Sequence, residues 1–166
     1  MKTIYFVRHA KSSWQELDLS DHKRGLLPKG EKKTKKIAVW MKNNNAVPDL
    51  IITSSATRAK ATAKIIAKNL NIPKEKIIVK DELYHGGMEE ILAALYGLPN
   101  KLNSVMIVGH NPTMTDIVNY YLSDDDQLIN FPTSAVASIN FFTDKWENLS
   151  LAKHKVKFVM FPSKLE

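Results

Sequence analysis

Short apolar runs recur along the chain, and each run is followed by a polar turn or loop and then by a stretch with helical spacing. Four of these runs have the length of a buried strand, and they cover residues 4–7, 50–53, 77–79 and 105–108. Such runs alternating with helices are typical of a parallel sheet whose two faces are both covered. The pattern therefore predicts an α/β fold with helices on both faces of a mostly parallel central sheet.

The stretches between the runs carry apolar residues three or four positions apart, which is the spacing of a helix with one buried face. We expect helices over residues 28–44 and 88–98, a third behind Ser54 and Ser55 with apolar positions from Ala59 to Leu70, and a fourth behind Asn111 with apolar positions from Met114 to Leu122. Two further apolar segments near the end of the chain predict strands that pair as a hairpin at the sheet edge, and they cover residues 136–141 and 156–161. The sheet should then have about six strands.

Length and composition fit one domain. The chain has 166 residues, of which 44% are hydrophobic and 25% are charged, and it contains no internal repeat, low-complexity tract or linker. No segment is apolar for long enough to span a bilayer, and the first apolar run is too short for a signal-peptide core. We therefore expect a single domain over residues 1–166, located in the cytoplasm and without a membrane partner.

The absence of cysteine narrows the chemistry. With no Cys in the sequence, disulfides, thiolate zinc sites and a cysteine nucleophile are all excluded. Covalent catalysis would have to use Ser, Thr, His or a carboxylate.

The net charge of +7 favours phosphorylated or polyanionic partners, although a lysine-rich solubilising surface explains most of it. The lysines lack interleaved aromatic residues and a recognisable reading motif, so we expect no nucleic-acid partner. The sequence does not give the oligomeric state, and a monomer is favoured. Only three of the 24 basic residues are arginines: Arg8, Arg24 and Arg58. Arginine can grip two oxygens with a planar fork, a geometry that lysine cannot copy.

The first candidate site lies where the run at residues 4–7 meets Arg8 and His9 and then ends. In open α/β sheets, ligands bind outside the carboxyl ends of the strands. A guanidinium beside an imidazole at such a place suits a phosphoryl group.

The second candidate site is the segment 53–58. Its strand delivers Ser54 or Ser55 as the N-cap of a helix, so that Arg58 falls in the first helical turn. Free backbone N–H groups and the helix dipole make that turn a good place for an anion. Alternatively, Arg58 is a solvated helix residue like Lys60, but the scarcity of arginine argues against this.

The third candidate site is the segment 108–112. Gly109 allows close backbone approach at the end of its strand, and His110 follows at the turn. Asn111 can cap a helix that starts at Pro112, where a missing N–H has no consequence. His110 should therefore point to the same place as Arg8 and His9.

Together these sites put two histidines and two arginines at the carboxyl ends of three strands, which converge on one crevice. A neutral imidazole can attack phosphorus and form a phosphohistidine that water later cleaves, with His9 or His110 as the nucleophile. Arg8, Arg58 and the remaining imidazole, if protonated, would stabilise the transition-state charge. No carboxylate pair of the kind that binds Mg²⁺ accompanies them, so we expect no metal and no cofactor.

Three segments, taken in order with their strand contexts, resemble the histidine phosphatase (phosphoglycerate mutase-like) superfamily. They are residues 8–10, 54–59 and 108–112. The best match is the short branch of SixA-type phosphohistidine phosphatases, and further support comes from residues 11–14, 21–30, 83–85 and 131–135. The resemblance spans nearly the whole chain and implies a phosphoglycerate mutase-like fold.

The resemblance also implies roles for single residues. His9 would be the phosphorylated nucleophile, and Arg8, Arg58 and His110 would form the phosphate pocket. Ser13 and Asn111 are further candidates for substrate binding.

Many larger members of the superfamily place a glutamate after the third strand as a proton donor, whereas this chain has His85 there and Glu82 just upstream. SixA-type members resemble this chain in lacking the glutamate. A nitrogen leaving group from a P–N bond needs little help from a general acid. His85 is either a donor or an exposed turn residue.

The expected function is a metal-independent phosphatase that acts through a phosphohistidine intermediate on phosphohistidine in proteins, because the short chain leaves little for a lid over a small substrate. A phosphatase of small phosphomonoesters is the alternative enzyme. A phosphoryl-binding module without turnover is a third interpretation, which the presence of both His9 and His110 argues against. The charged helical face of residues 32–36 is solvated, or it could guide an acidic phosphoprotein to the crevice.

Overall fold

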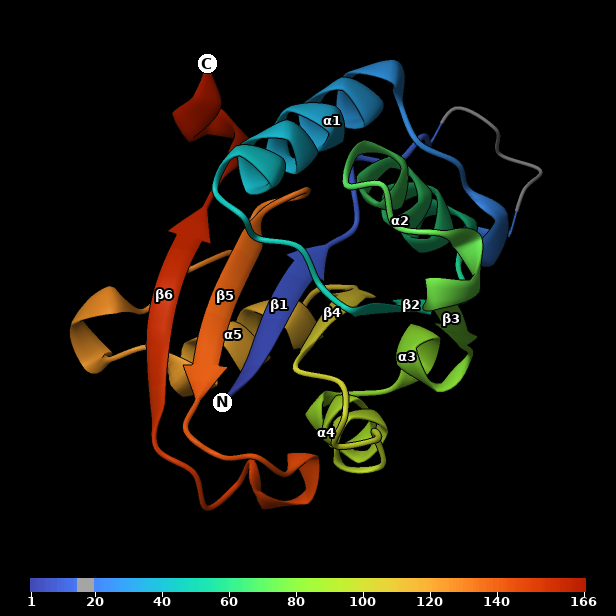
Figure 1. The fold of residues 1–166 in the computed structure, drawn as a ribbon. Helices are drawn as coiled ribbons and strands as arrows, with labels where there is room; N and C mark the ends of the chain where they lie inside the picture. The colour runs from blue at the N-terminus through green and yellow to red at the C-terminus, as the bar shows by residue number, and fades with distance from the viewer. Residues whose placement is uncertain (15–19) are drawn as a thin grey trace.

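Six strands form one sheet in the computed structural model, which describes residues 1–14 and 20–166 (Figure 1). The strands are β1 (Lys2–Arg8), β2 (Leu50–Ser54), β3 (Ile77–Lys80), β4 (Ser104–Gly109), β5 (Val136–Phe141) and β6 (His154–Met160). Their order is β3-β2-β4-β1-β5-β6. The first four are parallel, β5 is antiparallel to β1, and β6 is antiparallel to β5. The predicted mostly parallel sheet of about six strands, with a hairpin at its edge, is confirmed.

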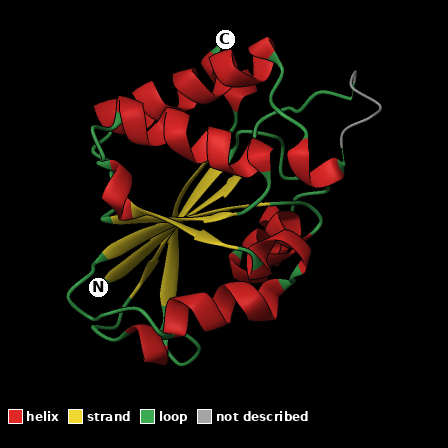
Figure 2. Ribbon diagram, turned by 90° about the vertical axis from the view of Figure 1, so that its right-hand side faces the viewer, coloured by secondary structure: helices red, strands yellow, loops and turns green. Residues whose placement is uncertain are grey.

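The four predicted helices are all present, and Figure 2 shows helices on both sides of the sheet. They are α1 (Pro28–Asn43), α2 (Thr57–Asn69), α4 (Met88–Tyr96) and α5 (Thr113–Tyr121). The short helix α3 (Glu82–His85) was not predicted. Nor were the 3-10 turns η1 (Asp21–Lys23), η2 (Lys74–Lys76), η3 (Asp124–Asp126), η4 (Trp146–Asn148) and η5 (Pro162–Leu165). Elements this short do not show a helical period in the sequence.

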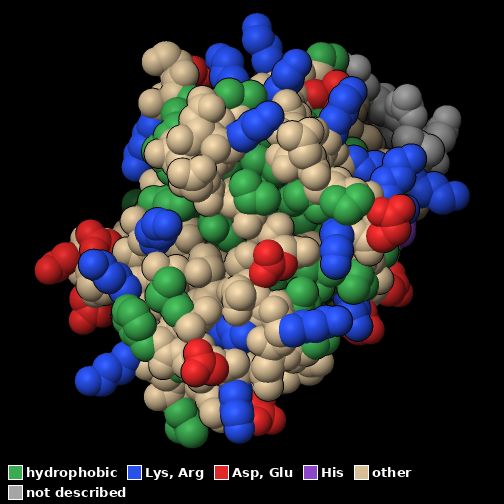
Figure 3. Space-filling view, viewed as in Figure 1, with side chains coloured by type: hydrophobic (Ala, Val, Ile, Leu, Met, Phe, Trp, Pro, Cys, Tyr) green, Lys and Arg blue, Asp and Glu red, His purple; other side chains and the backbone are tan. Residues whose placement is uncertain are grey.

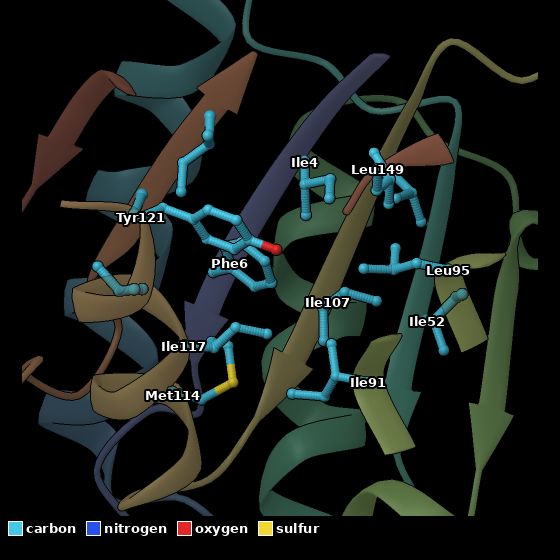
Figure 4. Close-up of a cluster of buried hydrophobic side chains, with 14 of the residues drawn as sticks. Ile4, Phe6, Ile52, Ile91, Leu95, Ile107, Met114, Ile117, Tyr121 and Leu149 are labelled. Carbon is cyan, nitrogen blue, oxygen red and sulfur yellow. The ribbon is translucent and has the colours of Figure 1, made fainter. Parts of the chain in front are cut away.

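Two hydrophobic clusters hold the helices to the sheet, because successive side chains of a strand point to opposite faces. In β1, Ile4 and Phe6 belong to the cluster that includes residues of α4 and α5, and Figure 4 shows this cluster around Phe6 and Tyr121. Tyr5 and Val7 belong to the cluster that includes residues of α1 and α2. The helix pairs α1/α2 and α4/α5 therefore cover opposite faces of the sheet.

Three local predictions were wrong. The run at 77–79 is not a buried strand, because β3 lies at the edge of the sheet with Ile78 39% and Val79 50% exposed. The N-cap of α2 is Ala56 rather than Ser54 or Ser55, since both hydroxyls bond elsewhere, to the His110 ring and the Asp81 carboxylate.

The third wrong prediction concerns the start of α5. The helix begins at Thr113 with Pro112 as its N-cap, one residue later than predicted, following a cis peptide bond between Asn111 and Pro112.

Among the described residues, no helix is both long and apolar enough to cross a bilayer.

Candidate active site

The register between β1 and β4 places the two predicted histidines side by side. Arg8 pairs with Gly109, so His9 and His110 are the next residues on two adjacent parallel strands. The His9 backbone N–H donates to the Gly109 carbonyl at 3.0 Å, and the two imidazole centroids are 5.0 Å apart. A Cβ on Gly109 would lie 2.8 Å from the Met114 sulfur, so a larger residue there would require the Met114 side chain to move. The structure therefore brings the carboxyl ends of β1 and β4 together, as predicted.

His9 is held in one tautomer. Its Nδ1 lies 2.7 Å from the Ala10 carbonyl oxygen, which can only accept, so Nδ1 carries the proton and Nε2 keeps its lone pair. The side chain is 8% exposed. Burial lowers the pKa of His9 to about 4, and the positive charges of Arg58 and Arg8 contribute to the same shift. His9 is therefore a neutral imidazole with a free nucleophilic nitrogen at neutral pH.

His110 is also neutral at neutral pH. Burial lowers its pKa to about 3, and the adjacent His9 and Arg58 add to the shift. Its Nε2 lies 2.7 Å from the Ser54 hydroxyl, and the edge of its ring meets Tyr84 at 5.6 Å between centroids. Its Nδ1 is buried and has no hydrogen-bond partner.

Asp21 holds Arg58 in place. The Arg58 guanidinium donates to the Asp21 carbonyl at 2.7 Å and to its carboxylate at 3.0 Å, and the Tyr84 hydroxyl donates to the same carboxylate oxygen at 2.6 Å. These contacts join η1, α2 and α3. The Tyr84 hydrogen bond first, and then Arg24 and Arg58, hold the pKa of Asp21 well below its usual range. A permanently ionised Asp21 fixes the direction of a guanidinium that is itself 6% exposed.

Arg24, the third arginine, binds groups of the protein itself. It donates to the Asp21 carboxylate at 2.9 Å and to the Ser12 hydroxyl at 2.6 Å. Its guanidinium also lies 3.5 Å from the centroid of the Trp14 ring, which is otherwise exposed. The loop after β1 is thereby tied to Asp21, and Ser13 accepts from Arg24 and donates to Gly25 through its backbone.

Arg8 and Asn111 share partners in the loop before β5. Arg8 Nη1 donates to the Phe131 carbonyl at 3.1 Å, and Asn111 Nδ2 donates to the Asn130 side chain at 2.9 Å. The side-chain oxygen Oδ1 of Asn111 accepts from the backbone N–H of Thr115, so Asn111 still caps the start of α5. The Nε groups of Arg8 and Arg58 are buried without a partner. Each guanidinium therefore has an N–H that no protein group accepts.

These side chains line a cavity of about 510 Å³. All four predicted catalytic residues border it, as does Asn111, and the remaining described lining residues are Lys11, Ser12, Trp14, Arg24, Asn130, Pro132 and Thr133. Ser13 lies between two of these residues, and its role in substrate binding stays a prediction. No carboxylate is among the described lining residues. Within residues 1–14 and 20–166, no group of three His, Asp or Glu side chains is arranged to hold a metal ion.

Glu82 and His85, the two proton donors considered from the sequence, are exposed residues of α3 outside this lining. Glu82 borders a different pocket, on the α4 side. His85 contacts the Tyr84 ring at 4.2 Å between centroids.

Sequence reasoning assigned no role in the site to Asp21 and Tyr84, and it gave Ser54 only the role of a helix cap. They act by contact with Arg58 and His110, at separations of 37, 26 and 56 residues. The available signal was the scarcity of arginine, since a buried arginine needs a carboxylate partner.

Comparisons with known proteins agree with this geometry. The family model described as "Histidine phosphatase superfamily (branch 1)" matches residues 4–95. A solved structure of a candidate phosphohistidine phosphatase SixA from Agrobacterium tumefaciens is 27% identical and superposes with a TM-score of 0.83, covering 97% of this chain and 98% of that one.

Two further proteins are similar over nearly their whole length. Phosphohistidine phosphatase SixA of Escherichia coli strain K12 is 24% identical over 160 residues, which is 90% of this chain and 98% of that protein. The structure of the protein histidine phosphatase SixA in complex with tungstate has the same fold, with a TM-score of 0.82, 24% identity and 99% coverage of both chains.

Proposed function

Since the chain belongs to branch 1 of the histidine phosphatase superfamily and is a phosphatase, we propose that it hydrolyses phosphohistidine on proteins with His9 as the nucleophile. The observation that carries the proposal is the state of His9: neutral, buried and held through Nδ1, with Nε2 free. A nucleophile has to present a lone pair in a fixed direction, and this imidazole does so without a second base.

The reaction has two displacement steps. In the first, the His9 Nε2 lone pair forms a bond to phosphorus while the bond to the leaving nitrogen breaks. The substrate imidazole, already protonated on its other nitrogen, keeps the electron pair and leaves as a neutral imidazole. In the second, water attacks phosphorus, the P–N bond to His9 breaks and its electron pair returns to Nε2. Inorganic phosphate is released and His9 is neutral again.

Arg8, Arg58 and His110 stabilise the charge on the phosphoryl oxygens. Arg58 is preorganised by Asp21, and both arginines keep an unpaired Nε–H. Donors that are fixed before the reaction need no reorganisation when charge develops, which is the main source of such stabilisation. An incoming phosphoryl dianion would also raise the proton affinity of His110, which would then add a donor. The three groups can supply this stabilisation without a metal ion, and we propose a metal-independent reaction.

The leaving group is a nitrogen rather than an alcohol oxygen. A protonated imidazole leaves readily, whereas an alkoxide needs a positioned acid. The described lining residues include no carboxylate, and Glu82 and His85 lie outside the cavity. These features favour phosphohistidine over small alkyl phosphates.

The test compares three substrates: a peptide bearing phosphohistidine, an aryl phosphate and an alkyl phosphate. We expect kcat/KM to be highest for phosphohistidine and lowest for the alkyl phosphate. Glu82→Gln and His85→Ala should change the phosphohistidine activity less than twofold, because neither side chain reaches the cavity. Loss of a general acid typically lowers the rate about 100-fold or more. Efficient hydrolysis of the alkyl phosphate that disappears in either variant would identify the protein as a phosphomonoesterase instead.

A further inference from the structure

Helices α1 and α2 carry positive charge that the chemistry at His9 does not use. They hold nine of the 21 lysines of the chain but only one carboxylate residue, Glu31. Of the ion pairs between described residues, none joins one of these lysines to a carboxylate. Lysines four positions apart on a helix, such as Lys60, Lys64 and Lys68, repel each other. A surface with such an excess of one sign attracts partners of the opposite charge.

The lysines border a groove of about 640 Å³ between the two helices. Lys32 and Lys35 line it from α1, and Lys64 and Lys68 line it from α2. Ala61 and Ile65, both half-buried, give it an apolar floor. Figure 3 shows Lys and Arg side chains gathered over the top of the molecule, where Figure 1 places α1 and α2.

The groove starts next to the catalytic cavity. On α2, Arg58 lines the cavity and Ala61 lines the groove, which is a rise of about 4.5 Å along the helix. On α1, Gly30 packs so closely on the backbone of Lys11, a cavity residue, that a Cβ would lie 2.5 Å from its carbonyl oxygen. Lys29 lowers the pKa of Lys11, so positive charge continues across the junction.

We propose that this groove docks an acidic, amphipathic segment of the phosphorylated protein whose phosphohistidine enters the catalytic cavity, an inference that rests on the proposed function. The apolar floor takes apolar side chains of the segment, and the lysines pair with its carboxylates. The groove runs from Ala61 to Asn69, about 12 Å along α2, which is the length of about two helical turns. A nucleic acid fits less well, because the described lining contains no aromatic side chain on which a base could stack.

The test uses three histidine-phosphorylated peptides with the same phosphohistidine segment. One carries an acidic amphipathic tail, one carries the same tail with every Glu replaced by Gln, and one has no tail. For the unmodified protein we expect KM to be about tenfold lower for the acidic tail than for the Gln tail, with kcat unchanged. The double variant Lys35→Glu/Lys64→Glu should lose this advantage, and Lys35→Gln/Lys64→Gln should lose part of it. Hydrolysis of the peptide without a tail should stay the same.

The matched control is Lys101→Glu/Lys153→Glu, which changes the net charge equally. Both control lysines are exposed, and they precede β4 and β6 at the opposite end of the sheet. The control should keep the preference for the acidic tail. A preference lost equally in both double variants would mean general attraction rather than docking, and would overturn the proposal.

The outcomes for docking and for catalysis are separable. Equal KM for all three peptides would overturn docking while the proposed function stands. If no peptide is hydrolysed, the proposed function fails, and fluorescence anisotropy of the unphosphorylated acidic-tail peptide still tests the groove. Binding that is weakened by Lys35→Glu/Lys64→Glu but not by the control supports docking. Poly(U) RNA of equal charge that displaces the peptide with higher affinity would overturn it in favour of a nucleic acid.

Discussion

Strand β1 holds a cation at each end, Lys2 at its start and Arg8 at its finish, and the two are bonded in different ways. Lys2 is 2% exposed, donates to the Asn100 and Leu102 carbonyls at 2.5 and 2.7 Å, and lies 5.4 Å from the centroid of the Trp146 ring. Arg8 bonds the Phe131 carbonyl, but its Nε is buried and unpaired.

The difference extends beyond these two residues. Two other buried atoms near Arg8 also have no hydrogen-bond partner, Nε of Arg58 and Nδ1 of His110. With Arg8 Nε, they make up three of the four buried unpaired polar atoms among the described side chains, and all three lie at the carboxyl end of the sheet. Protein groups satisfy Lys2, whereas Arg8 and Arg58 near His9 each keep an Nε–H that no protein group accepts. A buried cation whose donors are used stabilises the fold, and one whose donors stay free is suited to bind a ligand.

The largest effect should come from His9→Ala. The Nδ1 contact with the Ala10 carbonyl leaves the His9 Nε2 lone pair available to attack phosphorus, so we expect loss of phosphohistidine hydrolysis by about four orders of magnitude or more in its absence. The covalent phosphate, labile to acid and stable to base, should be trapped on His9 in the unmodified protein and absent from the variant. Substantial turnover by His9→Ala would assign the nucleophile to another residue.

Arg58→Lys should have the next largest effect. A lysine keeps the charge but cannot hold Asp21 with two nitrogens and still offer an N–H to phosphate. Loss of a transition-state contact of this kind costs about 2–4 kcal/mol, or on the order of a hundredfold in kcat/KM. Asp21→Asn, which leaves the guanidinium in place, should lose less. Nearly full kcat/KM in Arg58→Lys would remove Arg58 from the phosphate pocket.

Lys2→Met tests the other end of the strand. It leaves the Asn100 carbonyl without its lysine donor and removes the contact with Trp146, so the free energy of unfolding should fall by about 2–3 kcal/mol. Urea denaturation would measure the fall, and kcat/KM of the folded variant should remain within twofold of the original value. A variant that keeps its stability but loses activity would reverse the roles of the two ends.

The smallest effect per residue is the pH dependence of stability. The folded pKa values of His9 and His110, about 4 and about 3, lie below the usual 6.5 of an unfolded imidazole. The contribution of the two neutral histidines to the free energy of unfolding is therefore fully present above pH 6.5, and it is lost as the pH falls toward their folded pKa values. Between pH 6.5 and 5, each histidine should lower the free energy of unfolding by about 1–2 kcal/mol.

Urea denaturation at several pH values distinguishes the role of the site histidines from that of Lys2. The decrease in the free energy of unfolding with falling pH should be shallower in His110→Gln, which removes one of the two histidines. In Lys2→Met the free energy of unfolding should be lower at every pH, with the same dependence on pH. An unchanged slope in His110→Gln would contradict a neutral, buried His110.

The sequence by itself determined the strands, the main helices and the residues at the strand ends. These follow from local rules: a period of two or 3.6 in apolar positions, and a chain that turns where Gly109 and the polar residues begin. Local rules did not place the N-cap of α2, because Ser54 and Ser55 use their hydroxyls for tertiary contacts, and these rules placed the start of α5 one residue too early. Local rules also led to the wrong prediction that β3 is a buried strand, because only the strand order shows which strand lies at an edge of the sheet.

Only the tertiary structure decided how the site works. The insertion of β4 between β1 and β2 sets His110 beside His9, although about a hundred residues separate them. Asp21 reaches Arg58 and Tyr84 from a loop distant in sequence. Burial then makes both histidines neutral. Contacts between distant residues and the exclusion of water are properties of the packed chain, and a pattern of neighbours in sequence does not contain them.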